Sequence, residues 1–284
     1  MRLRRLYSEI ISHVRAFTLF KHKLIGYLSL FIFGCFIFGE GNAFEKDRPL
    51  KAATLDYPPY QYLENGEPKG IAVEIIQEAL RRTGVSQVVF EFYPWNRSVY
   101  LVRSGNSDLL FNAGKNAARQ QWGDYVESTL ILQKYVLFKR KELTIQVNAQ
   151  FDNVFNNNIA IRLGYLYGSG VFRQALEGGK FGEIFYSNST KQSIDLLLGK
   201  RIDFFVGDYL PIMHFINKNN LMDRVDVVKE SQDHSKNMEV LIWPTYILFS
   251  KKNIKNEYVN EVNSALQKMK ADGYVERVLD KYKY

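Results

Sequence analysis

Residues 50–82 read LKAATLDYPPYQYLENGEPKGIAVEIIQEALRR, and this stretch holds the local signals of one complete strand–loop–helix unit. Its first residues form a short extended run, which Tyr57-Pro58-Pro59 stops. Asn65-Gly66 marks a turn. From Ile71 to Arg82 the apolar residues recur at helical spacing, and Gly84 is placed to end the helix.

The same alternation continues to the end of the chain. Extended apolar runs alternate with amphipathic stretches, which predicts mixed α/β layers with helices covering the faces of a sheet. The predicted strands are 88–92, 108–111, 159–163, 202–206 and 246–250, and the predicted helices are 97–103, 171–176, 191–198 and 256–270.

Composition and charge narrow the class of protein. Of the 284 residues, 46% are hydrophobic and 24% are charged, so the chain can bury a core and is not a disordered protein. The net charge is +8, but residues 1–43 hold six of the basic and two of the acidic residues, which leaves +4 for the remainder. Without a basic run, this modest excess predicts no nucleic-acid partner.

Residues 1–43 have the order of a secretory signal. Lys21-His22-Lys23 precedes an apolar stretch from Leu24 to Gly39, and Gly41-Asn42-Ala43 supplies small residues for a cleavage site. A membrane anchor is the alternative, but this stretch of about 16 residues is shorter than the ~20 of a spanning helix. We therefore predict a signal peptide over 1–43, cleavage after Ala43 and a periplasmic location.

A second interpretation of the leader uses Cys35, the single cysteine of the chain. Ile32-Phe33-Gly34-Cys35 loosely resembles a lipoprotein cleavage box, which would anchor the protein through a lipid on Cys35. The chain after the leader has no cysteine and can form no disulfide of its own. Its histidines lack metal-ligand spacing, so we predict no metal site and no cofactor.

Catalytic patterns are mostly absent from the sequence. It contains no phosphate-binding loop ending in Gly-Lys-Ser/Thr. Ser169 lies in Gly168-Ser169-Gly170, which lacks the spacing of a nucleophile elbow and has no histidine nearby. We therefore predict a binding protein and not an enzyme.

Two segments contain aromatic residues at positions that could line a site: one is a proline-rich loop and the other is the start of a predicted helix. Asp56-Tyr57-Pro58-Pro59-Tyr60 is a loop that paired prolines hold rigid, and its plainer interpretation is a turn with packed tyrosines. Pro94-Trp95-Asn96-Arg97 places a tryptophan at a helix start, either in the core or as a face on which a ligand stacks.

Two further segments supply charge or backbone donors. Arg119 can form two-pronged bonds to a carboxylate, although a lone arginine is usually a surface residue. Gly168-Ser169-Gly170 leads into a predicted helix and offers free N–H groups to an anion. Asp208 follows an apolar run at the carboxyl end of a predicted strand, where open α/β sheets bind ligands; a helix N-cap is the alternative.

Taken in order, these segments resemble the motifs of the extracellular solute-binding proteins of family 3, the polar amino-acid receptors of ABC transporters. The resemblance extends from about Leu50 to Tyr282. Each motif is weak, and their common order carries the resemblance. The matching segments are Thr54–Tyr60, Gly70–Glu74, Trp95, Ser104–Asp108, Asn116–Arg119, Trp122–Tyr125, Gly164–Ser169, Gly199–Asp208 and Ala271–Gly273.

The resemblance implies a two-lobed periplasmic-binding-protein fold of type II, with α/β lobes joined by two crossover strands. On this sequence, lobe 1 would comprise 47–139 plus 246–284, and lobe 2 would comprise 143–243. Members of the family close these lobes on a ligand by a hinge motion.

The resemblance also implies residue roles. Arg119 matches the arginine that holds a ligand carboxylate, and Asp208 matches the acid that holds a ligand ammonium. Thr54 stands where some receptors carry an acid for basic side chains, so we expect a ligand that is not strongly cationic. The other predicted ligand-binding residues are Tyr57, Tyr60, Trp95, Asn112, Gly114, Ser169 and Gly170, and Phe111 and Tyr167 would add to an aromatic pocket.

The leading functional prediction is a monomeric protein that captures an amino acid or related small carboxylate and delivers it to the membrane permease of an ABC transporter. A cyclohexadienyl/arogenate dehydratase-like enzyme is an alternative, because such an enzyme shares this fold. A ligand-sensing partner of a membrane receptor is another.

Overall fold

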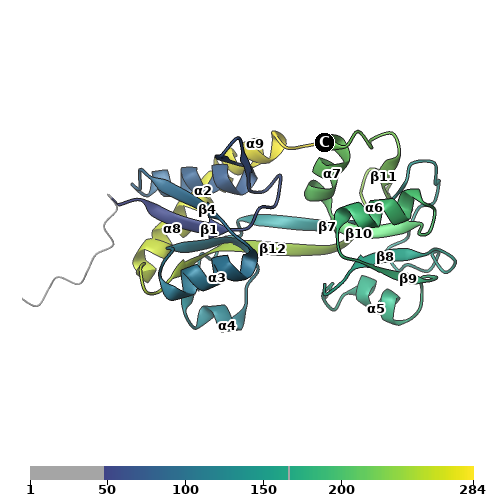
Figure 1. Cartoon of the computed structure of the whole chain (residues 1–284), viewed down its shortest axis with the longest axis horizontal. Helices are drawn as coiled ribbons and strands as arrows, with labels where there is room; N and C mark the ends of the chain where they lie inside the picture. The colour runs from purple at the N-terminus through teal and green to yellow at the C-terminus, as the bar shows by residue number, and fades with distance from the viewer. Residues whose placement is uncertain (1–47, 166) are drawn as a thin grey trace, which may run out of the picture. The chain divides into compact units, whose positions relative to one another are not determined.

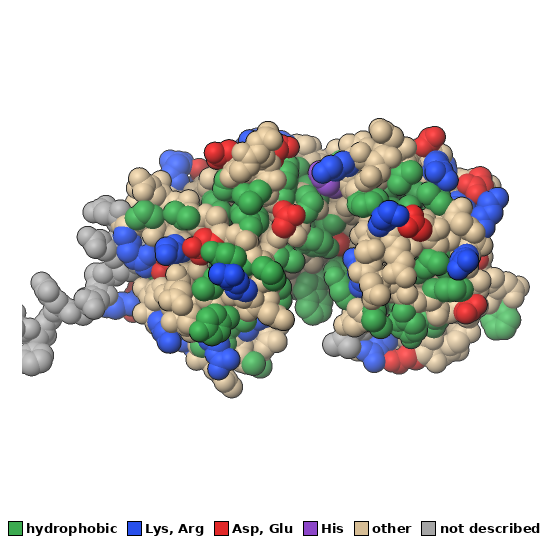
Figure 2. Space-filling view, viewed as in Figure 1, with side chains coloured by type: hydrophobic (Ala, Val, Ile, Leu, Met, Phe, Trp, Pro, Cys, Tyr) green, Lys and Arg blue, Asp and Glu red, His purple; other side chains and the backbone are tan. Residues whose placement is uncertain are grey.

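The computed structural model describes residues 48–165 and 167–284. The predicted signal peptide over 1–43 and the alternative lipid anchor at Cys35 therefore lie outside the described residues. Across the described ranges, no helix combines the length and the apolar composition needed to cross a membrane. Basic and acidic side chains are intermixed over the face of the described chain that Figure 2 shows.

Strands and helices alternate along the chain, and the strands join in the order β4-β1-β5-β12-β7-β10-β8-β9, with β6 beside β12 and β11 beside β7. β2 and β3 form a separate hairpin. The strands are β1 (Leu50–Thr54), β2 (Tyr62–Glu64), β3 (Glu67–Lys69), β4 (Val88–Phe92), β5 (Leu109–Ala113), β6 (Gly123–Tyr125), β7 (Ile131–Arg140), β8 (Ile159–Arg162), β9 (Ile184–Ser187), β10 (Phe204–Asp208), β11 (Val225–Val227) and β12 (Glu239–Ser250). The helices are α2 (Ile71–Arg82), α3 (Trp95–Ser104), α4 (Ala117–Gln120), α5 (Val171–Glu177), α6 (Thr190–Leu198), α7 (Tyr209–Lys218), α8 (Asn256–Ala271) and α9 (Tyr274–Asp280).

The first lobe is built on parallel strands. β1 pairs in parallel with β4 and β5, and β12 adds to β5 in antiparallel direction. α3 packs on β1 and β5, while α2 packs with α8 and α9, as Figure 1 shows. This arrangement brings the carboxyl ends of β1 and β5, and the loops that follow them, to one edge of the sheet.

The second lobe has helices on both faces of its sheet. In β10, Phe204 and Val206 join one apolar cluster, and Phe205 joins another, because successive side chains of a strand point to opposite faces. The first cluster includes Phe172 of α5, and the second includes Ile194 of α6 and residues of α7. A strand covered on both faces reads as an unbroken apolar run, which is how β10 appears in the sequence.

β7 and β12 connect the two lobes. β12 pairs antiparallel with β5 near its end and with β7 along Glu239–Thr245, while β7 pairs with β10 through Tyr135–Lys139. The predicted two-lobed fold with two crossover strands is confirmed, and the lobe boundaries at 47–139 plus 246–284 and 143–243 stay predictions.

Several predicted elements are found with the expected bounds, notably α2 and β4. α3 begins at Trp95, two residues before the predicted start, because the Pro94 carbonyl oxygen accepts the Arg97 N–H at 2.8 Å. β10 extends to Asp208, beyond its predicted end, because Asp208 pairs with Tyr135 of β7. No helix was predicted at α7, and of β7 the sequence predicted only the crossover at its end, from Lys139 onward.

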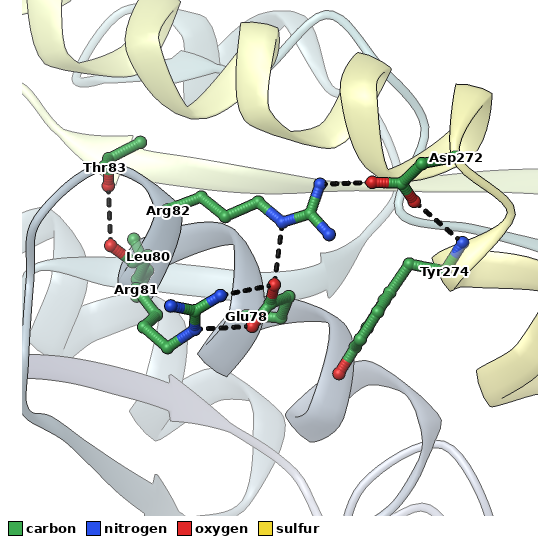
Figure 3. A network of polar contacts seen from close by, with 7 residues as sticks. All are labelled: Glu78, Leu80, Arg81, Arg82, Thr83, Asp272 and Tyr274. Atoms are coloured by element: carbon green, nitrogen blue, oxygen red, sulfur yellow. Dashed lines mark hydrogen bonds and ion pairs between the residues drawn. The ribbon is translucent and has the colours of Figure 1, made fainter.

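An ion-pair network holds α2 to the junction of α8 and α9 (Figure 3). Glu78 accepts hydrogen bonds from Nε of Arg81 at 2.7 Å and from Nε of Arg82 at 2.7 Å. Arg82 also donates from Nη1 to Asp272 at 2.6 Å, and Asp272 accepts the backbone N–H of Tyr274 at 3.0 Å. The hydrogen bonds from Arg81 and Arg82 lower the pKa of Glu78 from 4.5 to about 2, against an opposing effect of desolvation.

We expect Glu78→Gln to remove part of the acid sensitivity of the fold. Since the folded pKa lies below the unfolded one, the stabilisation by Glu78 is present above pH 4.5 and is lost as the pH falls towards about 2. The variant should lose about 0.2–1 kcal/mol of unfolding free energy at pH 7 and almost none at pH 2. Urea unfolding of both proteins at the two pH values measures this, with the exposed Glu257→Gln as control. Equal losses at both pH values would contradict it.

Candidate functional site

The loop between β1 and β2 forms one wall of the site. Tyr57 and Gln61 exchange backbone hydrogen bonds of 2.7 and 3.2 Å across this loop. The loop rests on the start of α2, where the Ala72 N–H donates to the Tyr60 carbonyl oxygen at 2.7 Å. Gly70 permits this contact: its φ is +117°, and a Cβ there would come within 2.5 Å of the same oxygen. The glycine therefore allows the loop that carries Tyr57 and Tyr60 to pack closely against the start of α2.

A cavity of about 400 Å³ lies beside this loop, and five of the predicted ligand-binding residues line it. They are Tyr57, Trp95, Asn112, Gly114 and Arg119. The other lining residues are Leu55, Lys115, Asn116, Gln133, Tyr135, Tyr165 and Trp243. The volume suits a small molecule, and aromatic rings with a few polar groups are typical of such sites.

Arg119 is presented to the cavity by the short helix α4. Asn116 caps this helix, since its side-chain oxygen accepts the N–H groups of Ala118 at 2.8 Å and Arg119 at 3.4 Å. Nη1 of Arg119 donates to the Gly114 carbonyl oxygen at 3.1 Å, and the guanidinium carbon lies 5.2 Å from the Trp95 ring centroid. The ion pairs of the described residues do not include Arg119, so its charge is available to an anionic ligand.

Three side-chain amides form a row of which two members, Asn112 and Gln133, line the cavity. Gln133 donates from Nε2 to Oδ1 of Asn112 at 3.3 Å, and Asn112 donates from Nδ2 to Oε1 of Gln61 at 3.0 Å. Asn112 adopts φ of +54°, a left-handed conformation that asparagine tolerates better than most residues. These two hydrogen bonds orient the amide of Asn112. They also link Gln61 of the β1–β2 loop, through Asn112, to Gln133 of the crossover strand β7.

Asp208 ends β10 on the second lobe, and its side chain is 3% exposed. Its carboxylate accepts the hydroxyl of Tyr57 at 3.2 Å and that of Tyr60 at 2.9 Å, both from the first lobe. Burial raises the pKa of Asp208 from 3.8 to about 7, although hydrogen bonds from Tyr60, Tyr57 and the Leu210 N–H oppose the shift. Asp208 occupies the N-cap position of α7 but makes no capping hydrogen bond of normal geometry.

The structure separates the remaining predicted residues from the main cavity. Tyr60 is buried and reaches Asp208 through its hydroxyl without lining the cavity. Ser169 and Gly170 are exposed at the start of α5, and only their neighbour Gly168 lines an adjoining cavity of about 250 Å³. Phe111 is fully buried and packs edge-on against Phe90.

Residues of the crossover strands were missed by sequence reasoning. Gln133 and Tyr135 of β7 and Trp243 of β12 line the main cavity. Trp243 is 43% exposed and covers Gly114, where an added Cβ would come within 2.8 Å of the indole Nε1. In the sequence, Gln133, Tyr135 and Trp243 lie in apolar stretches with interspersed polar residues. Such a pattern does not indicate which face of the strand lines a cleft. In the described chain, no three His, Cys, Asp or Glu side chains gather as a metal site would require.

The amino-acid sequence matches the model of a known protein family. The model of the bacterial extracellular solute-binding proteins, family 3, matches residues 50–283. No curated protein matches the chain.

Solved structures share the fold at low identity. The L-cystine solute receptor of Neisseria gonorrhoeae is 21% identical, with a TM-score of 0.63 over 82% of this chain and 92% of that one. A substrate-binding domain of a putative amino acid ABC transporter from Streptococcus pneumoniae is 16% identical, with a TM-score of 0.66 over 83% and 99%. An ancestral cationic amino acid solute-binding protein is 19% identical, with a TM-score of 0.64 over 82% and 95%.

Proposed function

The chain belongs to the bacterial extracellular solute-binding proteins of family 3, and we propose that it captures an amino acid or a related small carboxylate by closing its lobes in the periplasm. It then delivers the ligand to the permease of an ABC transporter. The proposed site consists of the predicted residues Tyr57, Trp95, Asn112, Gly114, Arg119 and Asp208, together with Gln133, Tyr135 and Trp243, while Tyr60 supports it through its hydrogen bond to Asp208. A role for Ser169 and Gly170 in anion binding stays a prediction.

One observation carries this proposal: a cation and an acid from different lobes face adjoining cavities. Arg119 of the first lobe has no carboxylate partner among the described residues, and Asp208 ends a strand of the second lobe. A ligand with a carboxylate and an ammonium would satisfy both groups, and it would add a link between the lobes to the hydrogen bonds that Asp208 already accepts from Tyr57 and Tyr60. Recognition and closure would then depend on the same pair of residues.

A thermal-shift screen with the twenty amino acids and a set of small carboxylates tests the function. A ligand at 100 times its Kd should add about 2.7 kcal/mol to the unfolding free energy. For a protein of this size that corresponds to a rise in Tm of roughly 5–10 °C. Small-angle scattering with the best ligand should show a smaller radius of gyration. If no compound of either class raises the Tm, the proposal fails.

Two observations keep an enzymatic alternative open to test. The solved structure of an ancestral amino acid-binding protein, a precursor of cyclohexadienyl dehydratase, shares the fold at 18% identity and a TM-score of 0.56. The pKa of Asp208 near 7 also suits an acid that donates a proton at neutral pH. Incubation with prephenate or arogenate distinguishes the two functions, since only an enzyme would release phenylpyruvate or phenylalanine.

A further inference from the structure

A second arginine, Arg162, faces the cleft from the second lobe. It ends β8 and lines a recess of about 40 Å³ that adjoins the main cavity, and the two share Tyr57, Tyr135 and Tyr165 as walls. Nη1 of Arg162 is buried and has no hydrogen-bond partner in the described chain. A buried guanidinium nitrogen without a partner is costly, so this one is expected to find its partner in a bound molecule.

Three serine and threonine side chains line the same recess as Arg162, alongside apolar residues of β10 and α7. Ser187 is the register partner of Arg162 on the neighbouring strand β9, and its Oγ lies 2.7 Å from Oγ of Ser193. Thr190 and Ser193 come from the first turn of α6, whose N-terminus carries a partial positive charge. Hydroxyl donors, a helix N-terminus and a guanidinium around one recess favour an anion there.

The charges around the cleft do not balance for a neutral ligand. Lys115 is paired with Glu127 at 2.9 Å, whereas Arg119 and Arg162 have no carboxylate partner in the described residues. Asp208 is the only acid among the residues that line the main cavity and the recess, and it accepts hydrogen bonds from two tyrosines. A zwitterionic ligand would satisfy Arg119 and Asp208 and would leave Arg162 unpaired.

We propose that the ligand carries a second anionic group, which enters the recess and pairs with Arg162 and the hydroxyls of Ser187, Ser193 and Thr190. The ligand class is then an acidic amino acid or a dicarboxylate. This inference rests on the proposed binding function and names the substrate class of the same site. The recess of about 40 Å³ has room for a carboxylate, which has three heavy atoms.

Titration calorimetry with isosteric acid and amide pairs tests the inference. The pairs are glutamate with glutamine, aspartate with asparagine, and succinate with succinamate. The wild-type protein should bind the acid of at least one pair tenfold or more tighter than its amide. Arg162→Gln should weaken binding of that acid by about 10- to 100-fold, the effect of losing a charge-assisted hydrogen bond, and should change binding of the amide less than threefold.

Arg173→Gln is the matched control, because it removes the same charge from α5 on the same lobe, where Arg173 pairs with Glu177 at the surface. The control should bind the acid as the wild type does. If Arg162→Gln does not fold, Arg162→Lys keeps the charge without the planar fork and should retain a preference for the acid.

The outcomes separate this inference from the proposed function. If the tightest ligand among amino acids and small carboxylates is neutral or cationic, the second-anion site is refuted while the binding function stands. Equal weakening of acid and amide by Arg162→Gln would also refute it. If no amino acid or small carboxylate binds the wild type, the proposed function falls and this inference falls with it.

Discussion

Arg119→Ala is expected to weaken binding of any α-carboxylate ligand by roughly 10²–10³-fold. In a closed cleft the guanidinium would pair with the ligand carboxylate, and breaking a buried pair costs about 3–5 kcal/mol, at 1.4 kcal/mol per decade of affinity. The geometry favours a large effect, because the Gly114 carbonyl oxygen and the Trp95 ring already hold the guanidinium in place. Little ordering of this side chain would remain to oppose binding.

Arg97→Ala is the matched control for this experiment. Arg97 lies on α3 in the same lobe, and its guanidinium carbon lies 4.7 Å from the Tyr93 ring centroid, so it is also a cation over an aromatic ring. It is exposed and does not line the main cavity. Calorimetry should give a wild-type Kd for Arg97→Ala. A similar loss in both variants would mean that Arg119 acts through the general field of the lobe and not by direct pairing.

Asp208→Asn is expected to distinguish ligands by their amine. The substitution keeps the shape of the side chain and removes its negative charge, so the ammonium of an amino acid loses its buried partner. Binding of the best amino-acid ligand should weaken by about 10²-fold or more, whereas its amine-free analogue should change less than about threefold. Equal losses for the two ligands would leave a carboxylate-binding protein that does not recognise the amine.

The raised pKa of Asp208 gives the same variant a second, independent signature. Below about pH 7 the carboxyl of the free protein becomes protonated, so affinity for amine-bearing ligands should fall with decreasing pH, and Asp208→Asn should abolish that dependence. Asp226→Asn, an exposed carboxylate of β11 in the same lobe, should leave the pH profile unchanged.

The stability of the ligand-free protein should move in the opposite direction. Because the folded pKa of Asp208 lies above its usual 3.8, its contribution to stability is fully present below pH 3.8 and is lost as the pH rises through about 7. At pH 8 the ligand-free Asp208→Asn protein should therefore be at least as stable as the wild type by urea unfolding. A large destabilisation at pH 8 would indicate that the carboxylate serves the fold and not the ligand.

The sequence predicted those helices in which one face is buried along the whole length. The apolar stripe of α2 buries seven of its twelve residues, and the same pattern predicted α8, because one-sided burial imposes a helical period on the sequence. α7 was missed because Pro211 stands in its first turn and its apolar residues follow one another closely. Proline is well tolerated there, since the first N–H groups of a helix have no partner within it.

The long crossover strands β7 and β12 have a less regular hydrophobic pattern in the sequence than the amphipathic helices have. β7 is buried on alternating residues at its start and on every residue from Tyr135 to Arg140, because it passes from one lobe into the middle of the second sheet. A change of environment within one strand breaks the alternation that identifies strands. For the same reason the predicted strand at 246–250 covered only the end of β12.

The sequence by itself determined the two-lobed α/β fold and the family, and it placed Asp208 at the end of a strand, since ordered motifs and strand ends are local features of the chain. Only the tertiary structure brought Gln61, Asn112 and Gln133 into one row of amides and left Nη1 of Arg162 buried without a hydrogen-bond partner in the described chain. It also left Ser169 and Gly170 exposed at the start of α5, where they do not line the main cavity. Such contacts join residues distant in sequence, and side-chain direction at a strand end depends on how the neighbouring strands and helices pack, which no local pattern records.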